Sequence, residues 1–234
     1  MCTVTFIPNS SDGFWLTSNR DEAPNRETLH PDRYPGDETT LLYPKDALAG
    51  GTWLGASDRP RWVCLLNGGF EAHERQLPYA MSRGKIVTQL LEAADGLSMI
   101  DQFDLSGIEP FTIVMIEGEQ DKSLYELVWD GRQSHFSEKP WAPHIWSSAL
   151  LYSAEARQKR QSWFSDFLFR HLTPTADEIL DFHRTAGEGD IRTNLIMDLG
   201  FVKTRSISLF CKNQQEAYLR YEDLLTKQTT VTPF

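Results

Sequence analysis

The N-terminal stretch 1-MCTVTFIPNSSDGFWLTSNRDE-22 carries the pattern of a β-hairpin. Residues 2–8 (CTVTFIP) alternate in period two and are rich in β-branched side chains. The dense turn signal NSSDG follows at 9–13, and 14–21 (FWLTSNRD) has the composition of a second strand. The chain is therefore predicted to open with two antiparallel strands that share one face of a sheet.

The position of the turn predicts which residues of the hairpin meet. If the turn is centred near Ser11, the numbers of paired residues sum to about 22. Cys2 is then expected opposite Arg20, with Asn19 and Asp21 as flanking neighbours, because cross-strand neighbours have Cβ atoms about 5 Å apart. A slip of one or two residues would change the facing residue but would still bring the N-terminus to the SNRDE stretch.

Composition indicates a globular chain and excludes some classes of partner. The 234 residues are 40% apolar and 24% charged, enough for one large domain or two small ones. The net charge of −10 argues against a nucleic-acid partner, because such binding neutralises phosphates with Lys and Arg. The basic run ARQKRQ at 156–161 is interpreted as the solvated face of a helix. No residue pattern specifies an oligomeric state.

Cysteine usage and hydropathy predict the compartment. The three cysteines, Cys2, Cys64 and Cys211, are too few and odd in number for a disulfide framework. Cys64 and Cys211 lie in apolar strand-like runs and are expected in the core. We see no signal-peptide pattern and no apolar run near the roughly 20 residues of a membrane span. A soluble protein of a reducing compartment, the cytoplasm, is expected.

The rest of the chain predicts an α+β protein. Further strands are expected at 52–57, 61–67, 111–117, 123–129, 204–211 and 216–222, and helices at 82–95, 154–171 and 175–186. The last helix has a T-x-x-E capping box, Thr175 and Glu178. The Pro-rich stretch 23–46 is expected to be a long loop. Blocks of strands and blocks of helices favour antiparallel sheets with helices packed on them, and no G-x-G-x-x-G or P-loop is present.

The chemistry of position 2 is distinctive if Met1 is removed. Cys2 then carries both a thiol, with an ordinary pKa of about 8.5, and a free α-amine, with a pKa near 8. The guanidinium of Arg20 would favour the thiolate, and the carboxylate of Asp21 would orient the terminal amine. Thiol and amine together form an activated nucleophile with its own base.

Several spaced motifs give the chain a resemblance to a known family. They are SNRDE at 18–22, GGTWLG at 50–55, LLNGG at 65–69, SRG at 82–84 and TRSISL at 204–209. In this order they resemble the NRDE family, also called the transport and Golgi organisation family. That family is in turn similar to the N-terminal-nucleophile hydrolases, especially the cysteine branch that contains bile salt hydrolase and penicillin V acylase.

The resemblance implies a fold and an activity. It implies one domain over 1–234 with an α+β, four-layer αββα sandwich, two antiparallel sheets between helical layers. It also implies that Cys2 attacks the C–N bond of a linear amide in a small N-acyl substrate. No metal or organic cofactor is implied, and the six histidines form no zinc-binding pattern.

The resemblance also assigns roles around Cys2. Asp21 matches the aspartate that positions the α-amine, and Asn19 matches an asparagine beside it. The amidases carry an arginine that contacts the thiol three residues before that aspartate. This chain has Ser18 there, so Arg20 is the substitute candidate.

Three later residues complete the implied site. Asn67, before Gly68, matches an asparagine that helps to form an oxyanion hole, and such donors are typically worth roughly 3–4 kcal/mol. Arg205 matches a late arginine of the amidase site. Ser148 stands where the family usually has a second oxyanion asparagine, so the oxyanion hole is reshaped or activity is reduced or absent.

A second function stays open at this point. Family members have been connected with lipid metabolism, haem trafficking and secretory organisation. On that view the chain is a carrier or homeostasis protein for haem or lipid-like ligands, and Cys2 is a ligand, a redox group or a relic. An amidase needs an ordered Cys2 amine beside Asp21, Asn67 and Arg205, whereas a carrier needs a wide apolar groove.

Overall fold

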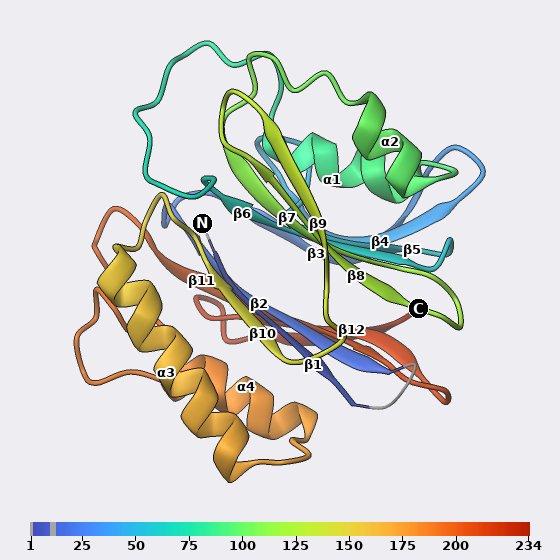
Figure 1. Ribbon diagram of the computed structural model, residues 1–234. Helices are drawn as coiled ribbons and strands as arrows, with labels where there is room; N and C mark the ends of the chain where they lie inside the picture. Colours follow the sequence, from blue (N-terminus) through green and yellow to red (C-terminus); the bar gives the residue numbers. More distant parts are fainter. Residues whose placement is uncertain (1, 10–12) are drawn as a thin grey trace. The chain divides into compact units, whose positions relative to one another are not determined.

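The computed structural model describes residues 2–9 and 13–234, with the backbone alone for Cys2 (Figure 1). The chain divides into two compact units. Unit 1 comprises the N-terminal residues up to Arg26 together with Ala142–Pro233, and unit 2 comprises Glu27–Trp141. Within the described residues, each unit contains one antiparallel sheet and two helices.

Unit 1 is built on a six-stranded sheet in the order β10-β1-β2-β11-β12-β13 (Figure 1). Its elements are β1 (Cys2–Pro8), β2 (Phe14–Glu22), β10 (His144–Ser147), α3 (Ala154–Arg170), α4 (Ala176–Thr185), β11 (Lys203–Lys212), β12 (Ala217–Asp223) and β13 (Thr229–Pro233). Both helices cover one face of the sheet, where Phe164 and Ile179 pack with Ile207 and Leu209 of β11. Alternate residues of β1 and β2 therefore point toward the helices.

The hairpin has the predicted register. Cys2 pairs with Arg20, Thr3 with Asn19, and the pairing continues to the other end of the hairpin. The amide of Asn9 donates to the carbonyl of Gly13 at 3.0 Å and closes it. The turn centre at 10–12 lies outside the described residues, but the pairing on both sides confirms the expected register.

Unit 2 is built on a seven-stranded sheet in the order β3-β4-β5-β6-β7-β8-β9. Its elements are β3 (Thr28–Pro35), β4 (Thr40–Asp46), β5 (Leu54–Ser57), β6 (Arg61–Asn67), α1 (Arg83–Glu92), α2 (Gly96–Gln102), β7 (Phe111–Glu117), β8 (Ser123–Trp129) and β9 (Ser134–Lys139). Every strand pairs antiparallel with the next one along the chain, so unit 2 is a meander with its two helices inserted between β6 and β7.

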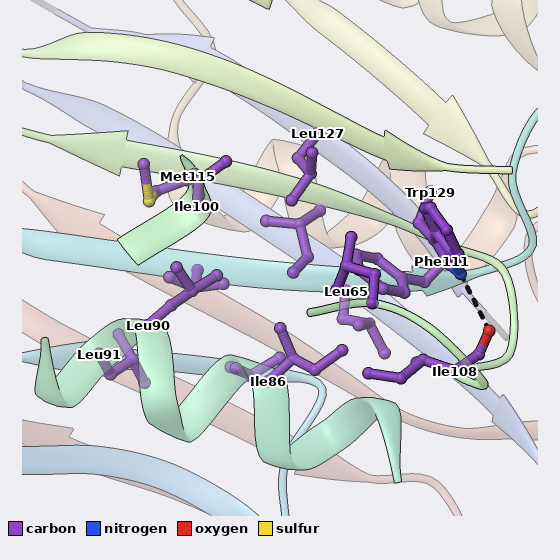
Figure 2. Close-up of a cluster of buried hydrophobic side chains, with 14 of the residues drawn as sticks. Leu65, Ile86, Leu90, Leu91, Ile100, Ile108, Phe111, Met115, Leu127 and Trp129 are labelled. Atoms are coloured by element: carbon purple, nitrogen blue, oxygen red, sulfur yellow. Dashed lines mark hydrogen bonds between the residues drawn. The ribbon is translucent and has the colours of Figure 1, made fainter. Parts of the chain in front are cut away.

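The core of unit 2 lies between α1 and the sheet (Figure 2). Ile86 and Leu90 are one helical turn apart on α1 and meet Met115 of β7 and other strand side chains in one buried cluster. The indole of Trp129 donates to the carbonyl of Ile108 at 2.9 Å, so the polar atom of this large core residue is satisfied.

Most predicted elements are confirmed, several with identical bounds. The strands at 61–67, 111–117 and 123–129 have the predicted limits. The expected helices begin and end within three residues of prediction, and the capping box of Thr175 and Glu178 is formed in both directions. Cys64 and Cys211 are buried, free thiols.

The prediction of a long loop at 23–46 is wrong, because β3 and β4 occupy most of it. β3 is an edge strand, where a proline need not remove a ladder hydrogen bond. The β3–β4 register shifts between Leu29 and Asp32, and this irregularity accommodates Pro31. The short strands β9, β10 and β13 and the helix α2 were also not predicted.

None of the helices in the described residues combines the length and apolar character that crossing a membrane requires.

Candidate active site

Cys2 begins a strand that has neighbours on both sides. β1 pairs with β2 through Cys2 and Arg20, and with β10 through Thr3 and Ser147. Continuing the second register by one residue brings position 148 opposite position 2. Ser148 is 1% exposed. The structure thus pairs the backbone of Cys2 with Arg20 and places Ser148 directly after the last residue of β10, while the Cys2 side chain lies outside the described residues.

Asp21 is a fully buried carboxylate with a donor on each oxygen. Oδ1 accepts from the hydroxyl of Thr204 at 2.7 Å, and Oδ2 accepts from the hydroxyl of Tyr152. The amide of Met197 donates to the Thr204 hydroxyl at 2.9 Å, and the Thr204 proton has Asp21 Oδ1 as its nearer acceptor and the carbonyl of Leu195, at 3.3 Å, as its more distant one. Burial raises the pKa of Asp21, although the hydrogen bonds from Tyr152 and Thr204 and the charge of Arg160 act to lower it.

Arg20 is the buried cation of the hairpin. Its side chain is 3% exposed, and its Nη2 lies 3.9 Å from Oε2 of Glu22. Burial acts to raise the pKa of Glu22, but the Ala23 amide and the charges of Arg20 and Arg26 contribute to a net lowering. The residue at the register position opposite Cys2 is therefore Arg20, and its role in place of an arginine at position 18 stays a prediction.

Asn19 lies on the helix-covered face and is held by backbone and imidazole. Its Nδ2 donates to the carbonyls of His183 at 3.1 Å and Leu195 at 3.0 Å. Its Oδ1 lies 2.5 Å from Nδ1 of His183. These contacts tie β2 to α4 and to the segment before β11, so they give Asn19 a supporting position.

Arg205 is the extra residue of a β-bulge. Thr204 pairs with Asp21 and Ser206 with Arg20, so Arg205 has no partner in the β2–β11 register. A bulge re-aims the side chain it carries. Here Nη1 of Arg205 donates to the carbonyl of Pro24 and, at 3.4 Å, to that of Ala23. Arg205 thereby holds the chain where it leaves the Asn-Arg-Asp-Glu segment.

Asn67 is the last residue of β6, in unit 2. Gly68 follows it with a φ of +91°, a conformation that favours glycine. The carbonyl of Gly68 accepts from Thr112 Oγ1 at 3.0 Å, which fixes this turn. The role of Asn67 as an oxyanion donor stays a prediction.

Sequence reasoning missed Tyr152, Thr204 and Arg160. The interpretation of 156–161 as a solvated helix face is wrong for Arg160, whose side chain is fully buried. Its spacing was the available signal, because Arg160 lies four residues from both Ala156 and Phe164 on the buried stripe of α3. No comparable pattern marks Tyr152, which lies between β10 and α3.

Within the described part of the chain, no group of three or more His, Cys, Asp or Glu side chains could hold a metal ion. The described residues place a buried carboxylate, Asp21, and a buried guanidinium, Arg20, next to each other on β2.

Comparison with solved structures defines the class of fold. A variant of conjugated bile acid hydrolase from Clostridium perfringens matches with a TM-score of 0.65 and 8% identity, over 99% of this chain and 92% of that one. Penicillin V acylase from Agrobacterium tumefaciens matches with a TM-score of 0.55 and 8% identity, over 100% and 86%. The Caenorhabditis elegans ortholog of N-acylethanolamine-hydrolyzing acid amidase matches with a TM-score of 0.58 and 11% identity, over 89% and 92%. The chain has the α+β fold of the N-terminal-nucleophile hydrolases.

Sequence comparison assigns the chain to a more specific group than the fold does. The model of the Transport and Golgi organisation 2 family matches residues 1–182, and the chain belongs to that family. The mouse Transport and Golgi organization 2 homolog is 31% identical over 116 residues, which cover 46% of this chain. The match spans 41% of the mouse protein's length.

Proposed function

We propose that this protein is an N-terminal-nucleophile cysteine amidohydrolase that cleaves the linear amide C–N bond of a small N-acyl substrate. Cys2 acts as the nucleophile once Met1 has been removed, and its own α-amine acts as the base. The observation that carries the proposal is the register of β1, which pairs Cys2 with the buried Arg20 and leaves the buried Asp21 next along β2.

The reaction balances with these groups alone. The neutral α-amine takes the thiol proton, and the thiolate attacks the acyl carbon to give a tetrahedral oxyanion. The C–N bond then breaks while the α-ammonium returns the proton to the leaving nitrogen, which leaves a thioester on Cys2. Water, deprotonated by the same amine, attacks the thioester, and the acid and the free thiol are released.

Each supporting residue has a proposed part in this sequence. Arg20 favours the thiolate, because an adjacent positive charge lowers a thiol pKa. Asp21 orients the amine. Asn67 and the hydroxyl of Ser148 donate to the oxyanion, and Arg205 holds the chain that follows Glu22. A cytoplasmic, reducing location suits the free thiols of this mechanism.

The substrate class follows from the proteins of the same fold. They are named for hydrolysing conjugated bile acids, penicillin V and N-acylethanolamines, all of which contain an acyl group on nitrogen. At 8–11% identity the likeness supports the fold. The acyl-amide class therefore remains the proposal to be tested, and no nucleic acid or cofactor takes part in it.

The first test is chemical rather than enzymatic. Untagged protein is measured by intact mass before and after a short treatment with iodoacetamide at neutral pH, and the modified site is mapped by peptide analysis. We expect loss of Met1 and fast, selective alkylation of Cys2. Retention of Met1, or a Cys2 no more reactive than an ordinary thiol, contradicts the amidase and favours the carrier.

A screen of N-acyl amides then tests turnover. Cys2→Ala should abolish hydrolysis, while Cys64→Ala, which removes a buried thiol from β6, should retain it after correction for folded protein. A Cys2→Ala variant that still hydrolyses the substrate would rule out the mechanism.

A further inference from the structure

We propose that Tyr152 and Arg160 are positioning residues for the N-terminal nucleophile, acting through Asp21 and Thr3. The inference rests on the proposed function and extends it to two side chains beyond the reacting groups. Both side chains belong to unit 1 and are buried, with exposed fractions of 3% for Tyr152 and 0% for Arg160.

Arg160 ties the start of β1 to the segment before β11. Its Nη1 donates to the hydroxyl of Thr3, the residue that follows Cys2. Its Nε donates to the carbonyl of Thr193 at 2.9 Å, and its Nη2 donates to that of Asn194. Every guanidinium nitrogen thus has a partner, and one of these partners is the neighbour of the proposed nucleophile.

Arg160 is also connected to Asp21 through the aromatic ring of Tyr152. Its Cζ lies 3.5 Å from the centroid of the Tyr152 ring, a cation–π contact that is buried and therefore strong. The hydroxyl of the same ring donates to Oδ2 of Asp21. Guanidinium, phenol and carboxylate form one chain from α3 to β2, with the positive charge at one end and the negative charge at the other.

The phenol acts as the donor to Asp21 in this chain. Burial and then the charge of Asp21 raise the pKa of Tyr152 well above its ordinary value, so the hydroxyl keeps its proton across the range in which enzymes work. Burial and the charge of Arg160 lower the pKa of His183 to about 3, so the nearby imidazole of α4 adds no charge.

The other groups around Asp21 lie on β11 and on β2 itself. Thr204 of β11 donates to Oδ1, while Arg20 and Glu22 flank Asp21 on β2. Arg160 is therefore the cation of α3 that lies near Asp21. The Tyr152 ring lies between them, in contact with the guanidinium and hydrogen-bonded to the carboxylate. Arg160→Met removes a positive charge, whereas Tyr152→Phe removes the hydrogen bond through which the neutral phenol disperses the charge of the Asp21 carboxylate. Either change leaves more of that negative charge acting on the Cys2 thiol and amine, which raises the pKa of both groups.

The test is the pH dependence of Cys2 alkylation by iodoacetamide, measured on protein whose Met1 loss has been checked by mass. Tyr152→Phe and Arg160→Met should move the midpoint upward by about 0.5 to 1 pH unit. Arg160→Lys keeps the charge and should stay near wild type. Arg170→Met, at the exposed end of α3, is the matched control and should not move the midpoint.

The possible outcomes separate this inference from the proposed function. A wild-type midpoint below that of an ordinary thiol, about 8.5, with unshifted midpoints in folded Tyr152→Phe and Arg160→Met, overturns the inference alone. A wild-type midpoint at the ordinary value overturns the proposed function and the inference with it. Tyr152→Phe removes a single oxygen atom, so it provides the test if Arg160→Met does not fold.

Discussion

The imidazole of His183 and the carboxamide of Asn19 are joined by a buried hydrogen bond between Nδ1 and Oδ1 at 2.5 Å. Nδ2 of Asn19 donates to two carbonyls, which identifies Oδ1 as the acceptor. Nδ1 of His183 therefore carries a proton, and Nε2 accepts from the hydroxyl of Thr5 at 2.7 Å. The buried imidazole is neutral, because burial and the charge of Arg160 lower the pKa of His183 to about 3.

This pair predicts a loss of stability in acid. Burial and the charge of Arg160 lower the pKa of His183 from 6.5 to about 3, so the unfolded chain binds the proton more readily than the folded one. The contribution is fully present above pH 6.5 and is lost as the pH falls toward 3, by at most about 5 kcal/mol. Urea unfolding at pH 7 and pH 4.5 measures it.

His183→Gln is the control for the acid prediction. The variant lacks the titrating ring, so the difference in its unfolding free energy between the two pH values should shrink. Asp21 is present in both proteins, and its raised pKa acts in the opposite direction, with stability falling as the pH rises through its titration. An equal pH dependence in both proteins would contradict the assignment to His183.

The ion pair between the buried Arg61 and the partly exposed Glu117 of unit 2 predicts a clear effect of one substitution. Arg61 is 2% exposed, and its Nε and Nη2 donate to Oε1 of Glu117 across β6 and β7. Its Nη1 also donates to the carbonyl of Ala93 at 2.7 Å, at the C-terminal end of α1. Arg61→Met should lower the free energy of unfolding by about 1–3 kcal/mol, because Glu117, which is 23% exposed, loses its partner and the carbonyl of Ala93 loses a donor.

The matched control for Arg61 is Arg59→Met, two residues earlier. Arg59 is 25% exposed and has one ion pair, at 3.9 Å, with the exposed Glu38. Exposed pairs contribute about 0–1 kcal/mol, so this variant should unfold near the wild-type urea midpoint. Comparable losses in the two variants would contradict the importance of the pair of Arg61 and Glu117.

The capping box predicts a smaller effect at α4. The Thr175 hydroxyl accepts from the Glu178 amide at 3.3 Å, and the Glu178 carboxylate accepts from the Thr175 amide at 2.8 Å. Thr175→Ala should cost about 1 kcal/mol in thermal or urea unfolding. Thr185→Ala removes a hydroxyl from the last turn of the same helix and should cost less. A larger loss of stability for Thr185→Ala than for Thr175→Ala would contradict the role of the capping box.

The proposed oxyanion donors predict a kinetic signature. This test requires an acyl amide that the protein is known to hydrolyse. With that substrate, Asn67→Ala and Ser148→Ala should each lower kcat by about 10²- to 10³-fold with little change in KM, because the donors act on the transition state. Asn213→Ala alters the β11–β12 turn and should leave kcat unchanged. A rise in KM alone would instead assign Asn67 or Ser148 to substrate binding.

The fold was most predictable where its contacts are local. The hairpin register follows from one turn signal, because every pair from Cys2–Arg20 to Pro8–Phe14 depends on the same centre. The capping box is likewise a pattern of four residues. By contrast, β3 contains Pro31 and was assigned to a loop, because its tolerance of proline depends on its place at a sheet edge, which is a property of the whole sheet.

The residues of the candidate site on β2 were predictable from the sequence, whereas the residues of other elements that contact them were not. Arg20 and Asp21 follow from the hairpin, whereas Tyr152 and Thr204 reach Asp21 from more than 130 residues away in sequence. Arg160 was assigned to solvent because a basic run usually lies there. Its burial depends on partners at Thr3, Thr193 and Asn194, which no local pattern identifies.

The interior position of β1 has a consequence for hydrogen exchange. Chain ends usually fray, and their amides exchange quickly with solvent. Here the first strand is flanked by β2 and β10, so β1 should belong to the slowly exchanging core of unit 1. The backbone of Cys2 is then held by the cooperative unfolding unit that includes the whole sheet. The reactivity of Cys2 and the global stability of that unit should therefore be lost together.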